Sequence, residues 1–196
     1  MRISILLTHP NPDSFNHAIA QTVRDVLKGA GHGVILHDLY KEGFDPNLPH
    51  GECARDADLP PEIRTHCEEI SNADGIVIVH PNWWGMPPAV LKGWIDRVMR
   101  PGVAYEFLEG DSGEGVPRGL LKARAALVLN TADTSEARER DVFGDPLDTL
   151  WKNCVFGLCG VSRVIRRTFT IVVTSTEAQR RRWLEEARTL AARTFQ

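Results

Sequence analysis

A short polar segment near the N-terminus has the make-up of an anion-binding loop. It reads Thr8-His9-Pro10-Asn11-Pro12-Asp13-Ser14-Phe15-Asn16. A predicted helix follows it, and the first turn of a helix offers unpaired N–H groups and a positive dipole end to an anion. Asp13 or Ser14 could equally be an ordinary N-cap that needs no ligand. The segment fits neither GxGxxG nor GxxxxGK[ST], which disfavours a nicotinamide-type Rossmann site and a P-loop.

A second segment places two adjacent tryptophans between prolines. It reads His80-Pro81-Asn82-Trp83-Trp84-Gly85-Met86-Pro87-Pro88. Two neighbouring tryptophans cannot both point into one core, so at least one should present a flat apolar ring to a ligand. The prolines restrict the backbone, which suits a rigid platform for a ring system. Burial of a tryptophan in a subunit interface is the alternative interpretation.

A third segment carries small polar residues. It reads Asn130-Thr131-Ala132-Asp133-Thr134. Backbone N–H groups in such a loop could hydrogen-bond to the edge of a bound ring. By itself this pattern is weak, and it gains meaning only from the elements that position it.

Apolar runs alternate with helical periodicity along the chain. The runs predict strands at residues 2–8, 34–36, 76–79 and 125–129 and within 164–173. Helical spacing predicts helices at about residues 14–28, 61–72, 90–98 and 147–158. A last helix is expected to open at the capping box Thr174-x-x-Glu177. Residues 41–60 are expected to form a loop, and the glycine-rich residues 101–123 an excursion or lid.

This order predicts an α/β fold. Strands that alternate with helices form a parallel sheet, and right-handed crossovers place helices on both of its faces. We expect a doubly wound five-stranded sheet of order 2-1-3-4-5 and a single domain over residues 1–196. The ligand crevice of such a sheet lies between the carboxyl ends of its first and third strands. The first two segments described above follow these two strands.

Composition narrows the function classes. Of 196 residues, 42% are hydrophobic and 25% charged, which is typical of a globular protein and argues against disorder. No apolar run approaches the roughly 18 residues of a membrane helix. The apolar N-terminus ends too early for a signal peptide, so it is interpreted as a buried strand. The formal net charge of −3 disfavours nucleic-acid binding, although the chain from Val161 onward carries eight arginines against three glutamates.

The cysteines indicate neither a disulfide framework nor a metal site. Cys53, Cys67, Cys154 and Cys159 form no CxxC pair and have no histidines at ligand spacing. Cys154 and Cys159 lie in an apolar stretch and are expected in the core. We therefore expect a cytoplasmic protein in a reducing compartment, with no bound metal.

Three blocks of the chain resemble a known family. They are His9-Pro10 with Ser14-Phe15-Asn16, Pro81-x-x-Trp84, and Pro88-Ala89-x-Leu91-Lys92-Gly93-Trp94-x-Asp96-Arg97. In these blocks the chain resembles the flavodoxin-like NAD(P)H:quinone oxidoreductases of the DT-diaphorase type, including small bacterial members. The last block is long and ungapped, and the resemblance spans most of the chain.

The resemblance implies a flavin at the carboxyl edge of the sheet and a homodimer. The residues implied to bind the flavin phosphate region are His9, Ser14, Phe15 and Asn16. The residues implied to line the isoalloxazine ring are Pro81, Asn82, Trp83 and Trp84. Those implied to contact its pyrimidine edge are Asn130, Thr131, Ala132 and Asp133. No individual side chain is implied as a catalytic acid or base, because the flavin carries the chemistry.

The chain departs from the family pattern at two places. Asn130-Thr131-Ala132-Asp133 replaces the family's Thr-Thr-Gly-Gly. The carboxylate of Asp133 would be unfavourable near an electron-rich ring unless it points away or is hydrogen-bonded. Phe143 stands where larger members have a histidine, so their proton relay does not transfer. The chain also lacks their extra C-terminal segment, which favours FMN over FAD.

The resulting expectation is an oxidoreductase that passes a hydride from NAD(P)H through FMN, or FAD, to a quinone-like small acceptor. One alternative is a flavin-binding regulatory subunit of a potassium efflux transporter, for which the basic C-terminal part could serve as a docking surface. An electron-transfer flavodoxin is a third interpretation. It is disfavoured because such proteins are usually more acidic and rarely need a dimeric pocket for a second substrate.

Overall fold

In the computed structural model, which describes residues 1–108, 110 and 113–196, five strands form one parallel sheet. They are β1 (Arg2–Leu7), β2 (Gly33–Asp38), β3 (Gly75–Pro81), β6 (Ala125–Ala132) and β7 (Arg163–Thr170). They lie in the order β2-β1-β3-β6-β7, and each neighbouring pair is parallel. Counted within this sheet alone the order is 2-1-3-4-5, so the predicted α/β fold is confirmed.

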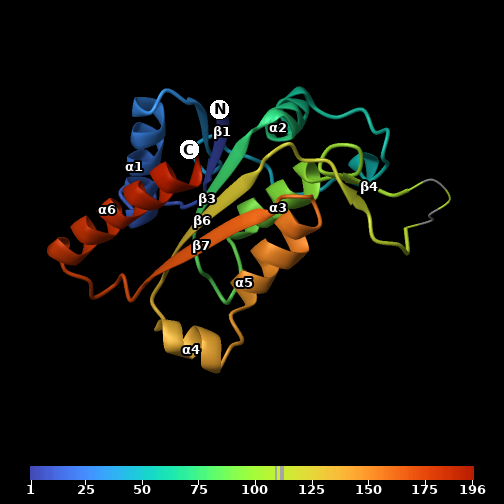
Figure 1. Cartoon of the computed structure of the whole chain (residues 1–196). Helices are drawn as coiled ribbons and strands as arrows, with labels where there is room; N and C mark the ends of the chain where they lie inside the picture. The colour runs from blue at the N-terminus through green and yellow to red at the C-terminus, as the bar shows by residue number, and fades with distance from the viewer. Residues whose placement is uncertain (109, 111–112) are drawn as a thin grey trace.

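Helices cover both faces of the sheet (Figure 1). On one face α1 (Phe15–Gly29) packs beside α6 (Glu177–Thr194). The other face is covered by α2 (Pro61–Asn72), α3 (Ala89–Val98) and α5 (Pro146–Thr149), which continues as the π-helical segment η2 (Leu150–Gly157). Among the described residues, none of the helices combines the length and apolarity needed to cross a membrane.

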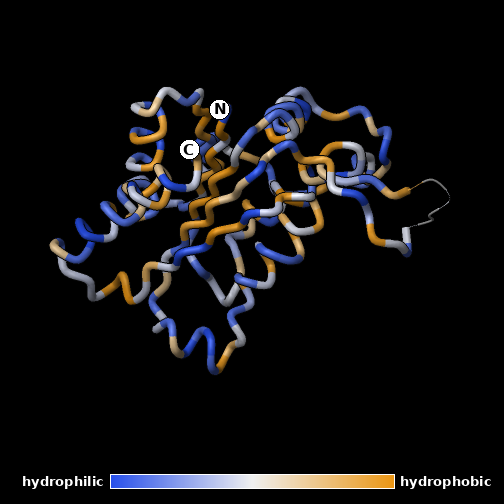
Figure 2. Tube along the Cα trace, viewed as in Figure 1, coloured by the Kyte–Doolittle hydropathy of each residue, from blue (hydrophilic) through white to orange (hydrophobic). Residues whose placement is uncertain are grey.

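The central strands are apolar on both faces. In β3, Ile76 and Ile78 join the core cluster under α2 and α3, whereas Val77 and Val79 join the cluster under α1 and α6. Figure 2 shows this apolar centre between helices with polar outer surfaces. The continuous apolar run in the sequence is therefore the signature of a strand covered on both sides.

The long loop between β2 and α2 is anchored to α3. It contains one 3₁₀ turn, η1 (His50–Glu52). Arg97 in α3 donates from Nε (2.9 Å) and Nη2 (2.6 Å) to the two carboxylate oxygens of Glu52, and both side chains are buried. Arg97 also donates to the carbonyl of Asp45 at 2.7 Å. A Cβ at Gly93 would lie 2.2 Å from the Pro46 carbonyl oxygen, so this approach requires glycine.

The start of the last helix was predicted wrongly. Its N-cap is Thr176, whose hydroxyl accepts from the N–H of Gln179 at 3.2 Å, and the expected capping box at Thr174 does not form. Both threonines are suitable caps by type. The choice depends on the turn before the helix, in which the Ser175 N–H donates to the Val172 carbonyl at 3.1 Å.

Two features of the second half of the chain, one helix and one cysteine, differ from what the sequence predicted. The helix α4 (Glu136–Asp141) is polar all round, so no apolar period predicted it. Cys159 is buried as expected, but Cys154 is exposed.

Residues 101–123 do leave the sheet, and β4 (Tyr105–Glu106) pairs antiparallel with β5 (Arg118–Gly119) within them. Residues 109 and 111–112 of this excursion lie outside the described residues, and a lid role stays a prediction.

Candidate functional site

Three loops meet at the carboxyl edge of the sheet. In the parallel register of β3 and β6, Pro81 lies opposite Thr131. Just beyond, the N–H of Asn82 donates to the Thr131 carbonyl at 2.7 Å. On the other side of β3, the N–H of Thr8 donates to the Val79 carbonyl at 3.0 Å. Backbone hydrogen bonds therefore hold the carboxyl ends of β1, β3 and β6 together. The predicted site residues lie at the ends of β3 and β6, in the loops that follow these three strands, and in the first turn of α1; the segment from Asn130 to Ala132, expected as a loop, is the end of β6.

The loop after β1 ends in Ser14, which is the N-cap of α1. Its hydroxyl oxygen accepts from the N–H of His17 at 3.3 Å. The ring of Phe15 packs against Phe169 and Trp183, with ring centroids 6.1 Å and 5.8 Å apart. Phe15 can therefore offer only its backbone N–H at the helix start. Capping leaves other N–H groups of the first turn without an intrahelical acceptor, so the helix start can still bind an anion.

Asn16 joins the first helical turn to β6. Its side chain is 3% exposed, and its Nδ2 donates to the Thr131 hydroxyl oxygen at 2.9 Å. Because a hydroxyl donates as well as accepts, the amide can turn over so that Thr131 donates to Oδ1 and Nδ2 becomes free. Asn16 can therefore present either an acceptor or a donor to a ligand.

Three buried side-chain oxygens at this edge have no hydrogen-bond partner within the described part of the chain. They are Thr8 Oγ1, Asn16 Oδ1 and Asn82 Oδ1. Leaving a buried polar group unpaired costs about 1–3 kcal/mol, so native proteins rarely keep such groups. Their clustering around the loops after β1 and β3 indicates that a polar ligand completes them. These three oxygens therefore fit a bound group with hydrogen-bonding atoms along its edge.

The two tryptophans form an exposed platform. Trp83 is 41% exposed and Trp84 is fully exposed. Trp84 (φ 57°) and Gly85 (φ 73°) occupy the centre of a tight turn, closed by two 3.0 Å backbone hydrogen bonds between Trp83 and Met86. A positive φ is costly for a residue as bulky as tryptophan. The surrounding structure thus holds the Trp84 ring in solvent although burial would be favourable.

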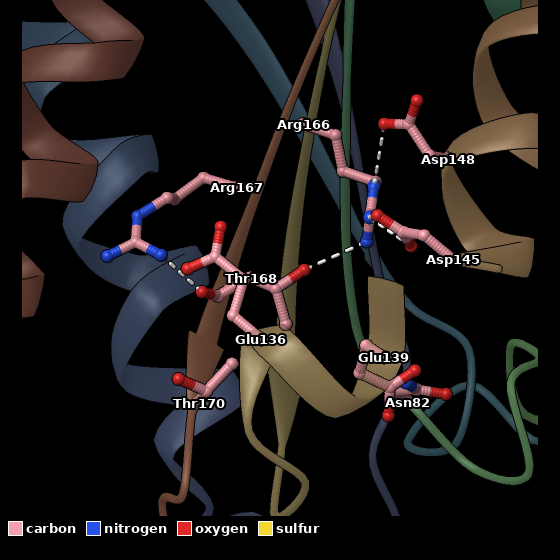
Figure 3. Close-up of a pocket in the computed structure, with 9 residues that line it drawn as sticks. All are labelled: Asn82, Glu136, Glu139, Asp145, Asp148, Arg166, Arg167, Thr168 and Thr170. Atoms are coloured by element: carbon pink, nitrogen blue, oxygen red, sulfur yellow. Dashed lines mark hydrogen bonds and ion pairs between the residues drawn. The ribbon is translucent and has the colours of Figure 1, made fainter. Parts of the chain in front are cut away.

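A cavity of about 550 Å³ opens beside this platform. Its lining residues are Asn82, Trp84, Gly85, Thr134, Glu139, Phe143 and Pro146. A smaller cavity of about 180 Å³ shares Asn82 and Glu139 and reaches Arg166 (Figure 3). Arg166 is largely buried and contacts the carboxylates of Asp145 and Asp148. These two carboxylates balance the guanidinium charge, so the smaller cavity is not an open anion site.

A buried hydrogen-bond network around His80, in β3, supports the loop that follows this strand. His80 Nδ1 donates to the Pro81 carbonyl at 2.8 Å. His80 Nε2 accepts from Asn130 Nδ2 at 2.6 Å and from Trp151 Nε1 at 3.0 Å. These bonds fix one neutral tautomer of the ring. Asn130 therefore turns its side chain toward His80, and it can meet a ligand at this edge mainly through its backbone.

The carboxylate of Asp133 is turned toward the loop after β7. Its Oδ1 accepts from the N–H of Val173 at 2.8 Å. The carboxylate is therefore hydrogen-bonded. The sequence analysis required this of an acidic residue at this position.

A family model described as a flavodoxin-like fold matches residues 1–192 of the chain. The chain belongs to this family. An "Uncharacterized NAD(P)H oxidoreductase" of Haemophilus influenzae is 34% identical over 164 residues, which cover 82% of this chain and 79% of that protein. The solved structure of Smu.1420 from Streptococcus mutans UA159 has a TM-score of 0.86 at 30% identity and covers 98% of this chain and 100% of that chain.

A second solved structure adds an activity to the comparison. The NAD(P)H:quinone oxidoreductase from Methanothermobacter marburgensis has a TM-score of 0.81 at 27% identity, covering 97% of this chain and 95% of that chain. The relatives of this flavodoxin-like chain are thus NAD(P)H oxidoreductases and quinone reductases. The chain is an enzyme of the NAD(P)H oxidoreductase type, as its sequence predicted.

The sequence did not predict several residues that lie at the site of this flavodoxin-like enzyme. Thr8 lies in the first segment, but nothing in the sequence marks its hydroxyl as buried. Glu139 lines both cavities from α4, a helix without an apolar period. Arg166 reaches the smaller cavity from the edge strand β7. Only the folded chain brings these side chains together, so no local pattern could have found them.

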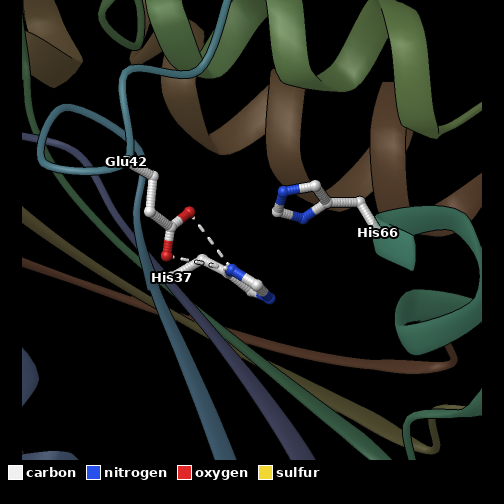
Figure 4. A group of neighbouring side chains, drawn as sticks. All are labelled: His37, Glu42 and His66. Atoms are coloured by element: carbon white, nitrogen blue, oxygen red, sulfur yellow. Dashed lines mark hydrogen bonds and ion pairs between the residues drawn. The ribbon is translucent and has the colours of Figure 1, made fainter. Parts of the chain in front are cut away.

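Within the described residues, one group of side chains has the spacing of metal ligands, and it lies between β2 and α2. It consists of His37, Glu42 and His66 (Figure 4). His37 Nδ1 lies 3.1 Å from Glu42, and its Nε2 lies 2.6 Å from Glu69. Both ring nitrogens of His37 therefore already face a carboxylate oxygen at hydrogen-bond distance. The group therefore acts as a hydrogen-bonded cluster between β2 and α2.

Acid should destabilise this flavodoxin-like enzyme through His80. Burial lowers the pKa of His80 to about 4, whereas the pKa of an unfolded histidine is ~6.5. Between these values the unfolded chain binds the extra proton, so stability present above about pH 6.5 is lost as the pH falls toward 4. One pKa unit corresponds to about 1.4 kcal/mol, so His80 accounts for a loss of roughly 3 kcal/mol in the free energy of unfolding.

Urea unfolding at a series of pH values measures this loss. His80→Gln should make the free energy of unfolding less dependent on pH in this window. His50→Gln, at an exposed histidine, is the matched control and should leave the dependence unchanged. Identical pH profiles for the wild type and His80→Gln would show that His80 does not contribute.

Proposed function

We propose that this chain binds FMN, or FAD, at the carboxyl edge of its sheet, accepts a hydride from NAD(P)H and reduces a quinone-like small molecule. We also propose that residues 1–196 form one flavin-binding domain. The NAD(P)H and quinone parts of the proposal come from the names of the relatives, and the flavin comes from the family resemblance and the site.

The observation that carries the proposal is the cluster of three unpaired buried oxygens beside an exposed tryptophan turn. Thr8, Asn16 and Asn82 supply the oxygens, and Trp83 and Trp84 supply the rings. A flavin combines a flat ring, a polar ring edge and a phosphate, and therefore matches stacking surface, hydrogen-bonding edge and helix start at once. A purely apolar ligand would leave the oxygens unpaired.

In this proposal each part of the chain has a separate task. A bound flavin supplies the hydride chemistry. Ser14, Asn16 and the N–H groups of the first turn of α1 bind the phosphate. The tryptophan turn stacks on the ring, and Asn82 pairs with its polar edge. His80 fixes the position of the Pro81 carbonyl through its hydrogen bond. The cavity beside Trp84 admits the nicotinamide or the acceptor and limits the access of water.

Flavin titration tests the cofactor directly. We expect the purified protein, alone or after incubation with FMN, to show a yellow flavin spectrum with one flavin per chain. Stacking on Trp84 should quench tryptophan fluorescence, and Trp84→Ala should weaken both quenching and affinity. Steady-state NADH oxidation with a soluble quinone then tests the reaction. Failure to bind FMN and FAD at tens of micromolar would refute the proposal.

We further infer that a second copy of the chain covers the open side of the site. Exposed apolar side chains gather at its cavity and turn, namely Trp84, Met86, Val142 and Phe143. A specific dimer covers about 800 Å² per chain, and such an apolar rim is a suitable part of that surface. Light scattering with flavin bound should give twice the chain mass. A monomer mass at working concentration would contradict the inference.

A reducing cytoplasmic location agrees with the cysteines. Cys53, Cys67, Cys154 and Cys159 are all unpaired in the structure. Burial raises the pKa of Cys67 and of Cys159 to about 11, which leaves both thiols protonated and unreactive. These thiols therefore support the proposed compartment and take no part in the proposed chemistry.

A further inference from the structure

Three polar side chains form a continuous chain behind the start of α1. Ser14 Oγ lies 2.9 Å from His17 Nδ1, and His17 Nε2 lies 2.9 Å from Asp38 Oδ2. The other oxygen of Asp38 accepts from the N–H of Lys41 at 3.2 Å. The side chains of His17 and Asp38 are only 10% and 14% exposed. One imidazole thus couples the Ser14 hydroxyl to a fixed carboxylate at the end of β2.

The chemistry of the partners sets the direction of these bonds. An ionised carboxylate only accepts, so His17 Nε2 carries a proton and donates it to Asp38. In the neutral ring Nδ1 is then an acceptor, and Ser14 donates its hydroxyl proton to it. In this state the Ser14 oxygen turns only lone pairs toward the helix start. It cannot donate a hydrogen bond to a phosphate there.

Protonation of His17 reverses the bond to Ser14. The imidazolium donates from Nδ1 to Ser14 Oγ, which frees the hydroxyl proton to turn toward a phosphate oxygen. We propose that His17 is a positioning residue that couples phosphate binding at Ser14 to the uptake of one proton from solvent. The proton is held on His17 Nδ1, and no covalent bond breaks. The inference rests on the proposed function, because it takes the flavin phosphate as the ligand.

The surroundings of His17 suit such coupling. A cavity of about 650 Å³ beside its ring gives solvent protons a route to it. The charged and titratable groups facing His17 are His9, Arg24, Asp38, Lys41 and Glu42. A phosphate dianion beside Ser14 would attract an imidazolium, so phosphate binding favours the protonated ring.

Asp38→Asn is the decisive variant, because the Lys41 N–H favours one orientation of the new amide. This N–H donates to Asp38 in the wild type, so it favours the amide oxygen on its own side and the NH₂ facing His17. His17 Nε2 must then accept, which places the ring proton on Nδ1 without any net charge. This neutral ring donates to Ser14 Oγ and leaves the hydroxyl free for phosphate. Asp38→Asn should therefore bind FMN without taking up a proton.

Calorimetry measures the proton directly. FMN is titrated into the apoprotein in buffers of different ionisation enthalpy, at a pH where ¹⁵N shifts show His17 neutral and the phosphate is fully ionised. We expect the wild type to take up close to one proton, so that its affinity falls almost tenfold per pH unit. Asp38→Asn should show no uptake and a flat profile. Riboflavin, which lacks the phosphate, should bind the wild type without uptake.

The outcomes separate this inference from the proposed function. FMN binding by the wild type without proton uptake, and with His17 still neutral by ¹⁵N shifts, would overturn the inference and leave the flavin proposal intact. No flavin binding at all would overturn both. Ser14→Ala offers a second route if Asp38→Asn folds poorly, since it should weaken FMN binding and abolish the uptake. Unchanged uptake in Ser14→Ala would also count against the coupling.

Discussion

Arg97→Met should lower the free energy of unfolding by about 3–5 kcal/mol, because it leaves the Glu52 carboxylate buried without a partner. The two side chains are 7% and 6% exposed, and two hydrogen bonds join them. Methionine fills a similar volume, so the loss is mainly electrostatic. The variant should also loosen the loop between β2 and α2, since Arg97 holds the Asp45 carbonyl. Urea unfolding measures the change.

Two further variants make this test specific. Lys92→Met removes an exposed ion pair with Asp96 on the same helix, and should cost less than about 1 kcal/mol. Arg97→Met combined with Glu52→Met removes both buried charges, so it should recover much of the stability lost in the single variant. Equal losses in Lys92→Met and Arg97→Met would show that burial adds nothing to this pair.

Asn16→Asp should abolish tight FMN binding, and its effect should exceed that of Asn16→Ala. The alanine variant loses one hydrogen bond to a charged group, worth roughly 1.5–3 kcal/mol, or about 10- to 150-fold in affinity. The aspartate adds a negative charge beside the phosphate in a site that is 3% exposed. Repulsion in such a poorly solvated place adds to the lost bond. FMN titration of the two variants measures the order.

The alternative predicts the reverse order. If Asn16 only supports the helix start, a carboxylate there interacts well with the helix dipole, by about 0.3–1 kcal/mol. Thermal melts of the apoproteins therefore accompany the titrations. Asn11→Asp makes the same charge change at an exposed position in the loop that precedes α1 and is the matched control. Equal FMN affinity in wild type and Asn16→Asp would remove the phosphate assignment without touching the tryptophan platform.

The local pattern of the sequence determined the fold. Continuous apolar runs at β1, β3 and β6 marked strands covered on both faces, and helical stripes such as Val90, Leu91 and Trp94 marked the helices between them. Strands and helices in strict alternation leave few topologies, because crossovers are right-handed. Errors arose where several local signals were equivalent, as with Thr174 and Thr176, or where a helix such as α4 had no buried stripe.

The sequence also marked the loops of the site, because loop residues that suit no core stand out. The tertiary structure alone decided what each side chain in those loops does. Asn16 meets Thr131, which is 115 positions away, and His80 meets Trp151 across 71 positions. Phe15 turns into the core, and Asp133 turns toward Val173. Local propensity depends only on residues that are close in the sequence, so it cannot predict such long-range pairings. The unpaired oxygens and the Ser14–His17–Asp38 chain therefore become visible only in the folded structure, where the sheet brings these loops together.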